Sequence, residues 1–239
     1  MSAVDRSATR LGQLATRYDL PEQAPAALAR LLALIAADPG APTAIRDPVA
    51  AADAHVADAL VGLDLELVRC ARRIADLGSG AGFPGLVLAA ALPHAQVALV
   101  EANRRKCAFL ERAVAEMQLA NVTVIPERAE SWAHGRVGHD LVTARALAPL
   151  AVLVEYAAPL LAAGGALVAW KGRRDPAAEA DGAAAASATG LGPAEVVAVG
   201  PWDGAEHLHL HLYLKVAETP HRFPRRPGIA SKRPLRAST

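Results

Sequence analysis

The chain has 239 residues, of which 53% are hydrophobic, and a formal net charge of +1. This length supports one main domain with a sizeable core, and so small a net charge does not by itself indicate a nucleic-acid partner. Cys70 and Cys107 are the only cysteines, which excludes a disulfide framework, and no run of about 18 apolar residues predicts a membrane span. We therefore expect a cytoplasmic protein without membrane contact.

The first part of the chain, residues 1–65, predicts a helical subdomain. Helical patterns run over 5–18, 21–40 and 47–63, and no strand pattern interrupts them. The Pro-Gly pair at the end of the second stretch predicts its stop, while Asp47 followed by Pro48 is typical of the start of a helix.

From Arg73 onward short apolar runs alternate with helical patterns, which predicts an α/β fold with a parallel sheet. Residues 194–200 and 207–216 then follow each other with only a turn between them, which predicts a closing antiparallel pair. We place this core at 66–218. The predicted strands are 73–77, 96–101, 121–126, 140–144 and 165–170, the helices between them 84–93, 103–119 and 150–164, and a further helix 176–189.

The final segment, 219–239, is rich in proline and arginine and contains no acidic residue. Such a composition buries little apolar surface, so we expect a poorly packed arm after Ala217. The charge asymmetry favours RNA as its partner.

A glycine-rich run, DLGSGAGFPG at 76–85, stands between a predicted strand and a predicted helix. Glycines at this position allow a tight turn in which a ligand approaches the backbone, and the helix N-terminus attracts an anion. That anion could be the pyrophosphate of a dinucleotide or the carboxylate of S-adenosylmethionine.

Two details favour S-adenosylmethionine over a dinucleotide. Asp76 precedes the glycines, where its carboxylate can face the cofactor's ammonium group or orient the loop. The closing antiparallel pair is typical of methyltransferase sheets. Glu101, at the end of the second strand, can accept hydrogen bonds from ribose hydroxyls of either cofactor. An NAD-dependent oxidoreductase therefore remains the alternative enzyme.

The chain resembles the bacterial 16S ribosomal RNA guanine-N7 methyltransferase family RsmG, also called glucose-inhibited division protein B. The resemblance rests on DLGSGAGFPGL, EANRRKCAFLERAVAEMQLANVTVIPERAES, VTARALAPL, WKG and TPHRFPRRPGIASKRPL, and it extends from about Pro42 to about Leu235. It implies a class I Rossmann-like seven-stranded methyltransferase sheet. It also implies a monomeric enzyme that transfers a methyl group from S-adenosylmethionine to N7 of one guanine of 16S ribosomal RNA in the small ribosomal subunit.

The resemblance also implies which residues bind the cofactor. The family's contacts fall on Gly78, Phe83, Ala129, Glu130 and Arg145, and our reading of the loop adds Gly80, Gly82, Asp76 and Glu101. The chain departs from the family pattern at Glu206, where members commonly have an arginine.

Guanine N7 carries an in-plane lone pair and is nucleophilic at neutral pH, so the reaction needs no general base. We therefore assign no catalytic acid or base, and treat Arg145 and Lys171 as positioning residues. Cations after the strands and in the tail are the candidate RNA contacts. They are Arg128, Lys171, Arg173, Arg225 and Arg226.

Several other features are given ordinary roles. His207, His209 and His211 alternate on a predicted strand, but neighbours on one face lie about 6–7 Å apart, too far to share an ion, so we predict no metal site. His55 is interpreted as a hydrogen-bonded packing residue. A ribosome-assembly factor with this fold and no turnover is the non-enzymatic alternative.

Overall fold

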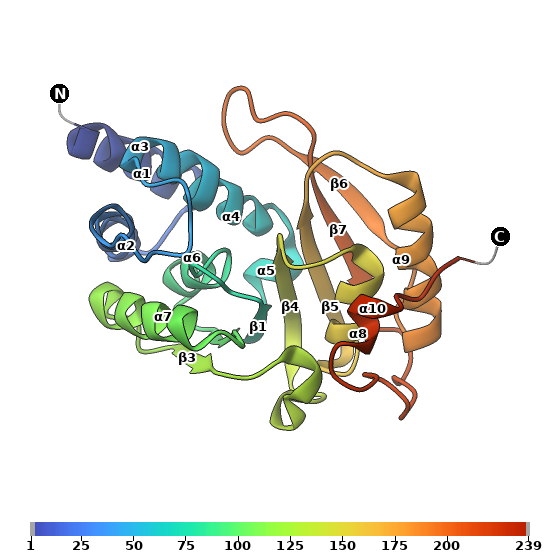
Figure 1. Cartoon of the computed structure of the whole chain (residues 1–239). Coiled ribbons are helices and arrows are strands. Elements are labelled where there is room, and N and C mark those ends of the chain that lie inside the picture. Colours follow the sequence, from blue (N-terminus) through green and yellow to red (C-terminus); the bar gives the residue numbers. More distant parts are fainter. Residues whose placement is uncertain (1–2, 238–239) are drawn as a thin grey trace.

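The computed structural model describes residues 3–237, so the outermost residues of the predicted subdomain 1–65 and tail 219–239 lie outside the described range. Its central feature is a seven-stranded sheet with the order β3-β2-β1-β4-β5-β7-β6 (Figure 1). The strands are β1 (Arg73–Leu77), β2 (Gln96–Val100), β3 (Val122–Ile125), β4 (His139–Arg145), β5 (Leu161–Lys171), β6 (Glu195–Val199) and β7 (Leu208–Leu214). The first five are parallel, and β7 pairs antiparallel with both β5 and β6. The predicted α/β sheet with its closing antiparallel pair is confirmed.

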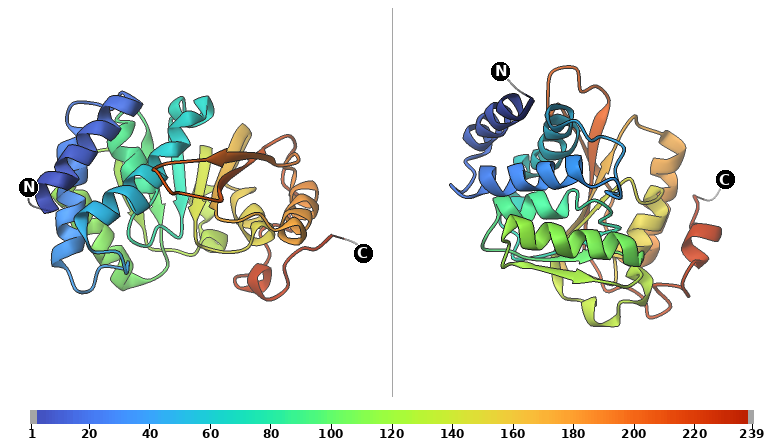
Figure 2. Two further views of the ribbon diagram at one scale, coloured as in Figure 1. Left: turned by 90° about the horizontal axis from the view of Figure 1, so that it is seen from above. Right: turned by 60° about the vertical axis from the view of Figure 1, so that its left-hand side comes forward.

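Helices cover both faces of this sheet (Figure 2). They are α1 (Ala3–Tyr18), α2 (Ala24–Ala37), α3 (Pro48–Ala51), α4 (Asp58–Leu60), α5 (Glu66–Arg69), α6 (Gly85–Ala91), α7 (Arg104–Met117), α8 (Leu150–Ala157), α9 (Pro176–Thr189) and α10 (Ile229–Lys232). Buried residues of α1 to α7 share one apolar cluster with the sheet, and those of α8 to α10 form a second cluster on the other face. None of the helices within 3–237 is long and apolar enough to cross a membrane.

The predicted helix start at Asp47 is confirmed, but the helix that follows is not regular. The Asp47 carboxylate accepts hydrogen bonds from the backbone N–H groups of Val49 and Ala50. Residues Ala52–Ala57 then form a π-helical segment before α4. A π turn rotates the following side chains relative to an α-helix, and this segment carries His55.

The predicted helix 150–164 is too long, which is a correction to the sequence reading. The structure ends α8 at Ala157 and begins β5 at Leu161. Pro159 lies between them, and a proline cannot donate the backbone hydrogen bond that would continue the helix. Residues 161–164 therefore extend the strand.

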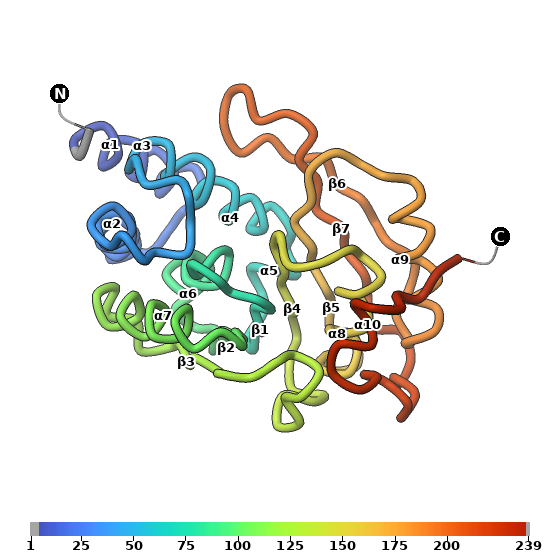
Figure 3. The backbone as a smooth tube through the Cα atoms, in the orientation of Figure 1, coloured from blue at the N-terminus to red at the C-terminus, as the bar shows by residue number. Residues whose placement is uncertain are grey.

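The expectation of a poorly packed arm after Ala217 is wrong. Phe223 and Ala230 are buried, and α10 lies beside α8, as the backbone trace shows (Figure 3). Arg225 forms an ion pair with Glu155 of α8. The composition of this segment indicates a solvated chain, but a few long-range contacts are enough to hold it.

Candidate active site

The glycine loop joins β1 to α6 with three residues in the left-handed backbone region. The φ angles of Gly78, Gly80 and Gly82 are 65°, 57° and 95°, values that residues other than glycine adopt only with strain. A Cβ atom on Gly78 would also collide with the Leu147 side chain. The predicted tight turn is therefore confirmed.

Asp76 is fully buried at the end of β1, and its carboxylate accepts a hydrogen bond from the end of this loop. Its Oδ1 accepts a hydrogen bond from Thr143 Oγ1 at 2.8 Å, and its Oδ2 accepts one from the Gly85 backbone N–H at 3.3 Å. Burial raises the pKa of its carboxyl to about 6, although these hydrogen bonds act in the opposite direction. The sequence left two roles open for Asp76, and these contacts agree with the second, which is to orient the loop.

The raised pKa of Asp76 predicts a pH-dependent stability term. A carboxyl with a pKa of 3.8 when unfolded and about 6 when folded stabilises the fold at acid pH, and that contribution is lost as the pH rises from about 4 to about 6. The difference corresponds to about 3 kcal/mol. In urea unfolding, we expect the free energy of unfolding of the Asp76→Asn variant not to show this loss between about pH 4 and about pH 6. Parallel pH profiles for both proteins would contradict the assignment.

Glu101 lies at the end of β2 and is pre-oriented by the backbone. Its Oε1 accepts from the Asn103 N–H at 2.8 Å and its Oε2 accepts from the Gly80 N–H at 3.2 Å. Each carboxylate oxygen can accept further hydrogen bonds. The carboxylate is therefore held in one position with acceptor capacity left for a ligand.

A cavity of about 350 Å³ opens at the carboxyl ends of the parallel strands, where such sheets bind ligands. It is bounded by the glycine loop, the end of β2, the loops after β3 and β4, and residues of α8 and α10. From the predicted site it brings together Gly78, Glu101, Arg128, Ala129 and Glu130, and it adds Leu147, Tyr156 and Ser231.

A larger cavity, about 670 Å³, lies near the amino end of β5 and the segment that follows β7, and none of the predicted site residues lines it. Lys215, which lines it, already donates hydrogen bonds to the carbonyl oxygens of Ala158 and Thr189. Size alone therefore does not identify the site. The smaller cavity is the candidate, because predicted cofactor-binding residues line it.

Arg145 and Phe83 lie together in a cluster beside the glycine loop. Arg145 Nη1 donates to Asp58 Oδ2 at 2.6 Å and to the Ala54 carbonyl oxygen at 3.1 Å. The Phe83 ring stacks on His55 with 4.4 Å between ring centroids, and the Arg145 guanidinium lies 5.3 Å from the Phe83 centroid. The π-helical segment and the first residue of α4 thus hold Arg145 at the end of β4, next to the cavity-lining residues that follow it.

His55 has polar neighbours at both ring nitrogens. Its Nδ1 lies 3.1 Å from Arg145 Nη2 and 3.1 Å from the Ala54 carbonyl oxygen. Its Nε2 lies 2.8 Å from Thr43 Oγ1. Burial, and then the charge of Arg145, lowers the pKa of His55 to about 4. His55 is therefore a neutral, hydrogen-bonded residue of the cluster at neutral pH.

The lowered pKa of His55 predicts a pH effect opposite in sign to that of Asp76. An unfolded histidine binds a proton below about 6.5, whereas the folded one does so only near 4, so stability is lost as the pH falls between these values. The term amounts to about 3 kcal/mol. We expect His55→Gln to show a smaller loss than the wild type between pH 7.5 and 4.5 in urea unfolding. An equal loss would mean that other groups dominate acid unfolding.

Sequence reasoning missed Asp58, the carboxylate that pairs with Arg145. Burial raises the pKa of Asp58 above its usual value, although the charge and hydrogen bond of Arg145 act in the opposite direction. The available signal was a second acidic residue, after Asp53, in a helical stretch that is otherwise mostly apolar.

The candidate RNA contacts lie in different environments. Arg128 is exposed at the cavity, and Arg173 and Arg226 are exposed. Lys171 is half-buried, donates to the Ala148 carbonyl oxygen at 2.6 Å, and has its pKa lowered by burial. Arg225 instead forms an ion pair with Glu155.

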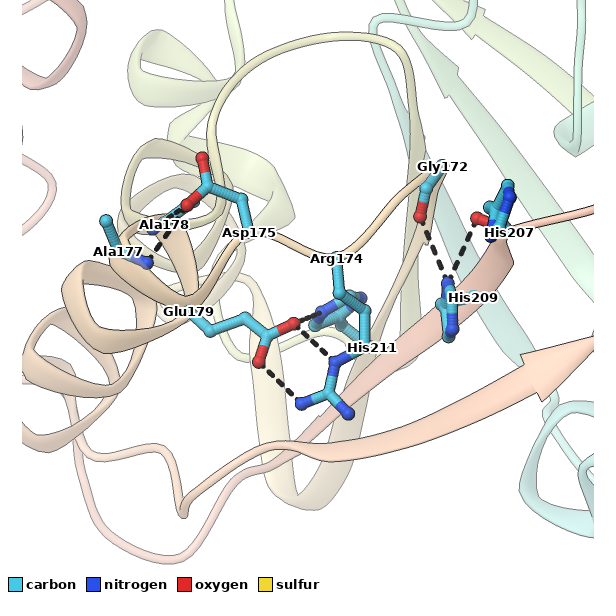
Figure 4. Close-up of polar contacts among 9 residues, drawn as sticks. All are labelled: Gly172, Arg174, Asp175, Ala177, Ala178, Glu179, His207, His209 and His211. Atoms are coloured by element: carbon cyan, nitrogen blue, oxygen red, sulfur yellow. Dashed lines mark hydrogen bonds and ion pairs between the residues drawn. The ribbon is translucent and has the colours of Figure 1, made fainter.

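The three histidines near β7 do not share one face of a strand, so that reading is corrected. His207 precedes β7 and has a φ of 62°. The His211 imidazole is buried and lies 3.3 Å from Glu179 Oε1, a carboxylate that also binds Arg174 (Figure 4). His209 Nδ1 lies 3.1 Å from the Gly172 carbonyl oxygen. Within the described chain, no group of three or more acidic, histidine or cysteine residues could hold a metal ion.

Comparisons with known proteins agree with this architecture. The family model GidB, described as rRNA small subunit methyltransferase G, matches residues 41–201. The ribosomal RNA small subunit methyltransferase G of Chloroflexus aggregans is 44% identical over 198 residues, covering 81% of this chain and 82% of that protein. The protein of the same name from Rubrobacter xylanophilus is 40% identical over 198 residues, covering 80% and 76%.

A solved structure with a similar fold is a SAM-dependent O-methyltransferase from Thermotoga maritima. It matches with a TM-score of 0.53 at 16% identity, covering 68% of this chain and 66% of that one. Identity this low shows the fold alone, which is that of the Rossmann-like methyltransferases. Because the family model spans most of the chain and relatives share two fifths or more of the aligned residues, the resemblance read from the sequence is confirmed: the chain belongs to the GidB family of small-subunit rRNA methyltransferases.

Proposed function

We propose that this chain uses S-adenosylmethionine to form N7-methylguanosine at one position of 16S ribosomal RNA in the small ribosomal subunit. The observation that carries the proposal is the cavity at the carboxyl ends of β1, β2 and β4, where the glycine loop, Glu101 and the Ala129–Glu130 stretch converge in a member of the GidB family.

The residues around the cavity fit this cofactor. Its volume of about 350 Å³ lies within the usual range for small-molecule sites. Leu147, which also lines the cavity, packs so closely on Gly78 that a Cβ atom there would collide with it. Glu101 offers acceptors for two ribose hydroxyls. When bound, the cofactor supplies an electrophilic methyl group.

The proposed cofactor contacts follow from these positions. Gly78, Gly80 and Gly82 would receive the cofactor along the loop, with Asp76 holding the loop in place. Ala129 and Glu130 would meet the adenine end, and Phe83 and Arg145 would border the reacting end. Because guanine N7 already carries its lone pair, the task of these side chains is to orient the reactants and exclude water.

RNA binding is proposed for the cations near the cavity. Arg128 borders it, and Lys171 is anchored on Ala148, another lining residue. Arg173 and Arg226 would contact phosphates farther out, since both are exposed. Such contacts make binding depend strongly on salt concentration.

The proposed reaction is tested with methyl-labelled S-adenosylmethionine and small ribosomal subunits from a strain that lacks this gene. We expect label in one N7-methylguanine of the 16S RNA, located by mass spectrometry. Cofactor binding without transfer would instead support the assembly-factor alternative. A thermal-shift response to NAD or NADP, with none to S-adenosylmethionine, would support an oxidoreductase.

A further inference from the structure

The C-terminal segment, defined here as residues 223–232, reaches the candidate cofactor cavity. Ser231 lines the cavity together with Gly78 and Glu101. Its Oγ lies 3.1 Å from the hydroxyl of Tyr156, another lining residue. The backbone N–H of Gly228 donates to Glu130 Oε1 at 3.0 Å. The C-terminal segment therefore touches two side chains of the cavity wall and supplies one itself.

One ion pair anchors this segment on α8. Both oxygens of Glu155 lie within 3.0 Å of Arg225 Nε, and Oε2 lies 2.5 Å from Arg225 Nη2. The Arg225 backbone N–H also donates to Glu155 Oε1 at 3.1 Å. The Glu155 side chain is 1% exposed and that of Arg225 is 25% exposed. A carboxylate this buried needs its partner, because an unpaired charge in the interior is costly.

The neighbouring arginine is in a different position. Arg226 is exposed, whereas Phe223 and Ala230 on either side of the pair are buried. Two adjacent arginines that look equivalent in the sequence thus have different environments. One holds the segment against the body of the protein, and the other faces solvent.

We propose that the C-terminal segment forms the outer wall of the cofactor cavity and that Arg225, through Glu155, is a positioning residue for cofactor binding. The proposal rests on the proposed function of this cavity. Arg225 acts by keeping the segment against the cavity. We call this arrangement closed: the Gly228 N–H binds Glu130, and the Ser231 hydroxyl contacts that of Tyr156. It therefore serves the cofactor, whereas the sequence assigned it to RNA.

The physical consequence is a change in the population of closed molecules. A ligand that needs the closed wall binds with an apparent dissociation constant equal to the intrinsic value divided by the closed fraction. If loss of the anchor leaves about one molecule in ten closed, the apparent dissociation constant rises about tenfold. The chemical step within the closed complex is unchanged.

The experiment compares Arg225→Met with the matched variant Arg226→Met. For each, the S-adenosylmethionine dissociation constant is measured by titration calorimetry, binding to small ribosomal subunits by filter binding, and kcat and KM by methyl transfer. We expect Arg225→Met to raise the cofactor dissociation constant and KM about tenfold, with kcat and subunit affinity close to wild type. Arg226→Met should leave the cofactor dissociation constant unchanged. Weaker subunit binding by Arg225→Met with unchanged cofactor affinity would overturn the proposal.

A second measurement uses the wild-type protein and does not depend on any variant folding. Hydrogen exchange of peptides spanning 223–232 is followed with and without saturating S-adenosylmethionine. Because binding is linked to closure, exchange there should slow about tenfold or more, while exchange in the β6–β7 loop, 200–207, stays the same. Equal exchange in the segment with and without cofactor would refute the proposal that the segment forms a wall of the cofactor cavity. Absence of any cofactor binding to wild type would instead refute the proposed function.

Discussion

Replacing Asp58 by asparagine is expected to lower the free energy of unfolding by about 3 kcal/mol, because removing one partner of a buried ion pair leaves the other charge unpaired. The side chains of Arg145 and Asp58 are only 17% and 12% exposed. For a chain of this size the loss corresponds to a fall in melting temperature of about 6 to 12 °C. Differential scanning calorimetry measures it directly.

The double variant Asp58→Asn/Arg145→Gln separates stability from activity. With both charges removed, no unpaired charge remains, so much of the stability should return. The double variant should still lack methyl transfer activity, because it has lost Arg145, which borders the proposed site. If Asp58→Asn melts at the wild-type temperature, Asp58 does not hold Arg145. Recovered activity in the double variant would remove Arg145 from the site.

Replacing Glu101 by glutamine is expected to raise the dissociation constant for S-adenosylmethionine about 10- to 100-fold. Both carboxylate oxygens accept backbone N–H groups, and a glutamine must turn its NH₂ group toward one of these donors. The variant also loses the charge that strengthens hydrogen bonds to hydroxyls, which contribute about 1.5 to 3 kcal/mol each when one partner is charged. Titration calorimetry measures the change.

The matched control for Glu101 is Glu127→Gln. Glu127 borders the same cavity but is exposed. The Glu127→Gln variant therefore removes the same charge from the cavity without removing a carboxylate that backbone N–H groups hold in place. Its dissociation constant should change by less than about threefold, since exposed charges interact weakly. Equal effects of both variants would show that only the overall charge of the cavity matters.

The fold could be predicted from the sequence because its signals are local. The strand, glycine loop and helix at 73–91 follow from apolar runs and from glycines whose left-handed φ angles other residues adopt with strain. The absence of a helical pattern between β6 and β7 predicted their antiparallel pairing. Errors arose where a local signal was misjudged, as at Pro159, which ends α8 before the apolar pattern does.

The candidate site was predictable only in part. Gly78, Glu101 and Ala129 follow strand ends, and parallel strands bring their carboxyl ends to one edge, so their meeting in the cavity follows from topology. Asp58 was missed because its role depends on Arg145, 87 positions away in the chain, and no local pattern in the sequence indicates that contact.

The sequence by itself determined the sheet, the glycine loop and the family, because each is carried by short contiguous motifs. The tertiary structure alone decided which charged residues pair. Arg145 meets Asp58 across 87 positions of the chain, and Arg225 meets Glu155 across 70. Such pairs depend on which side chains the folded core buries next to one another. That is why Arg225 and Arg226, adjacent and chemically identical, have different surroundings.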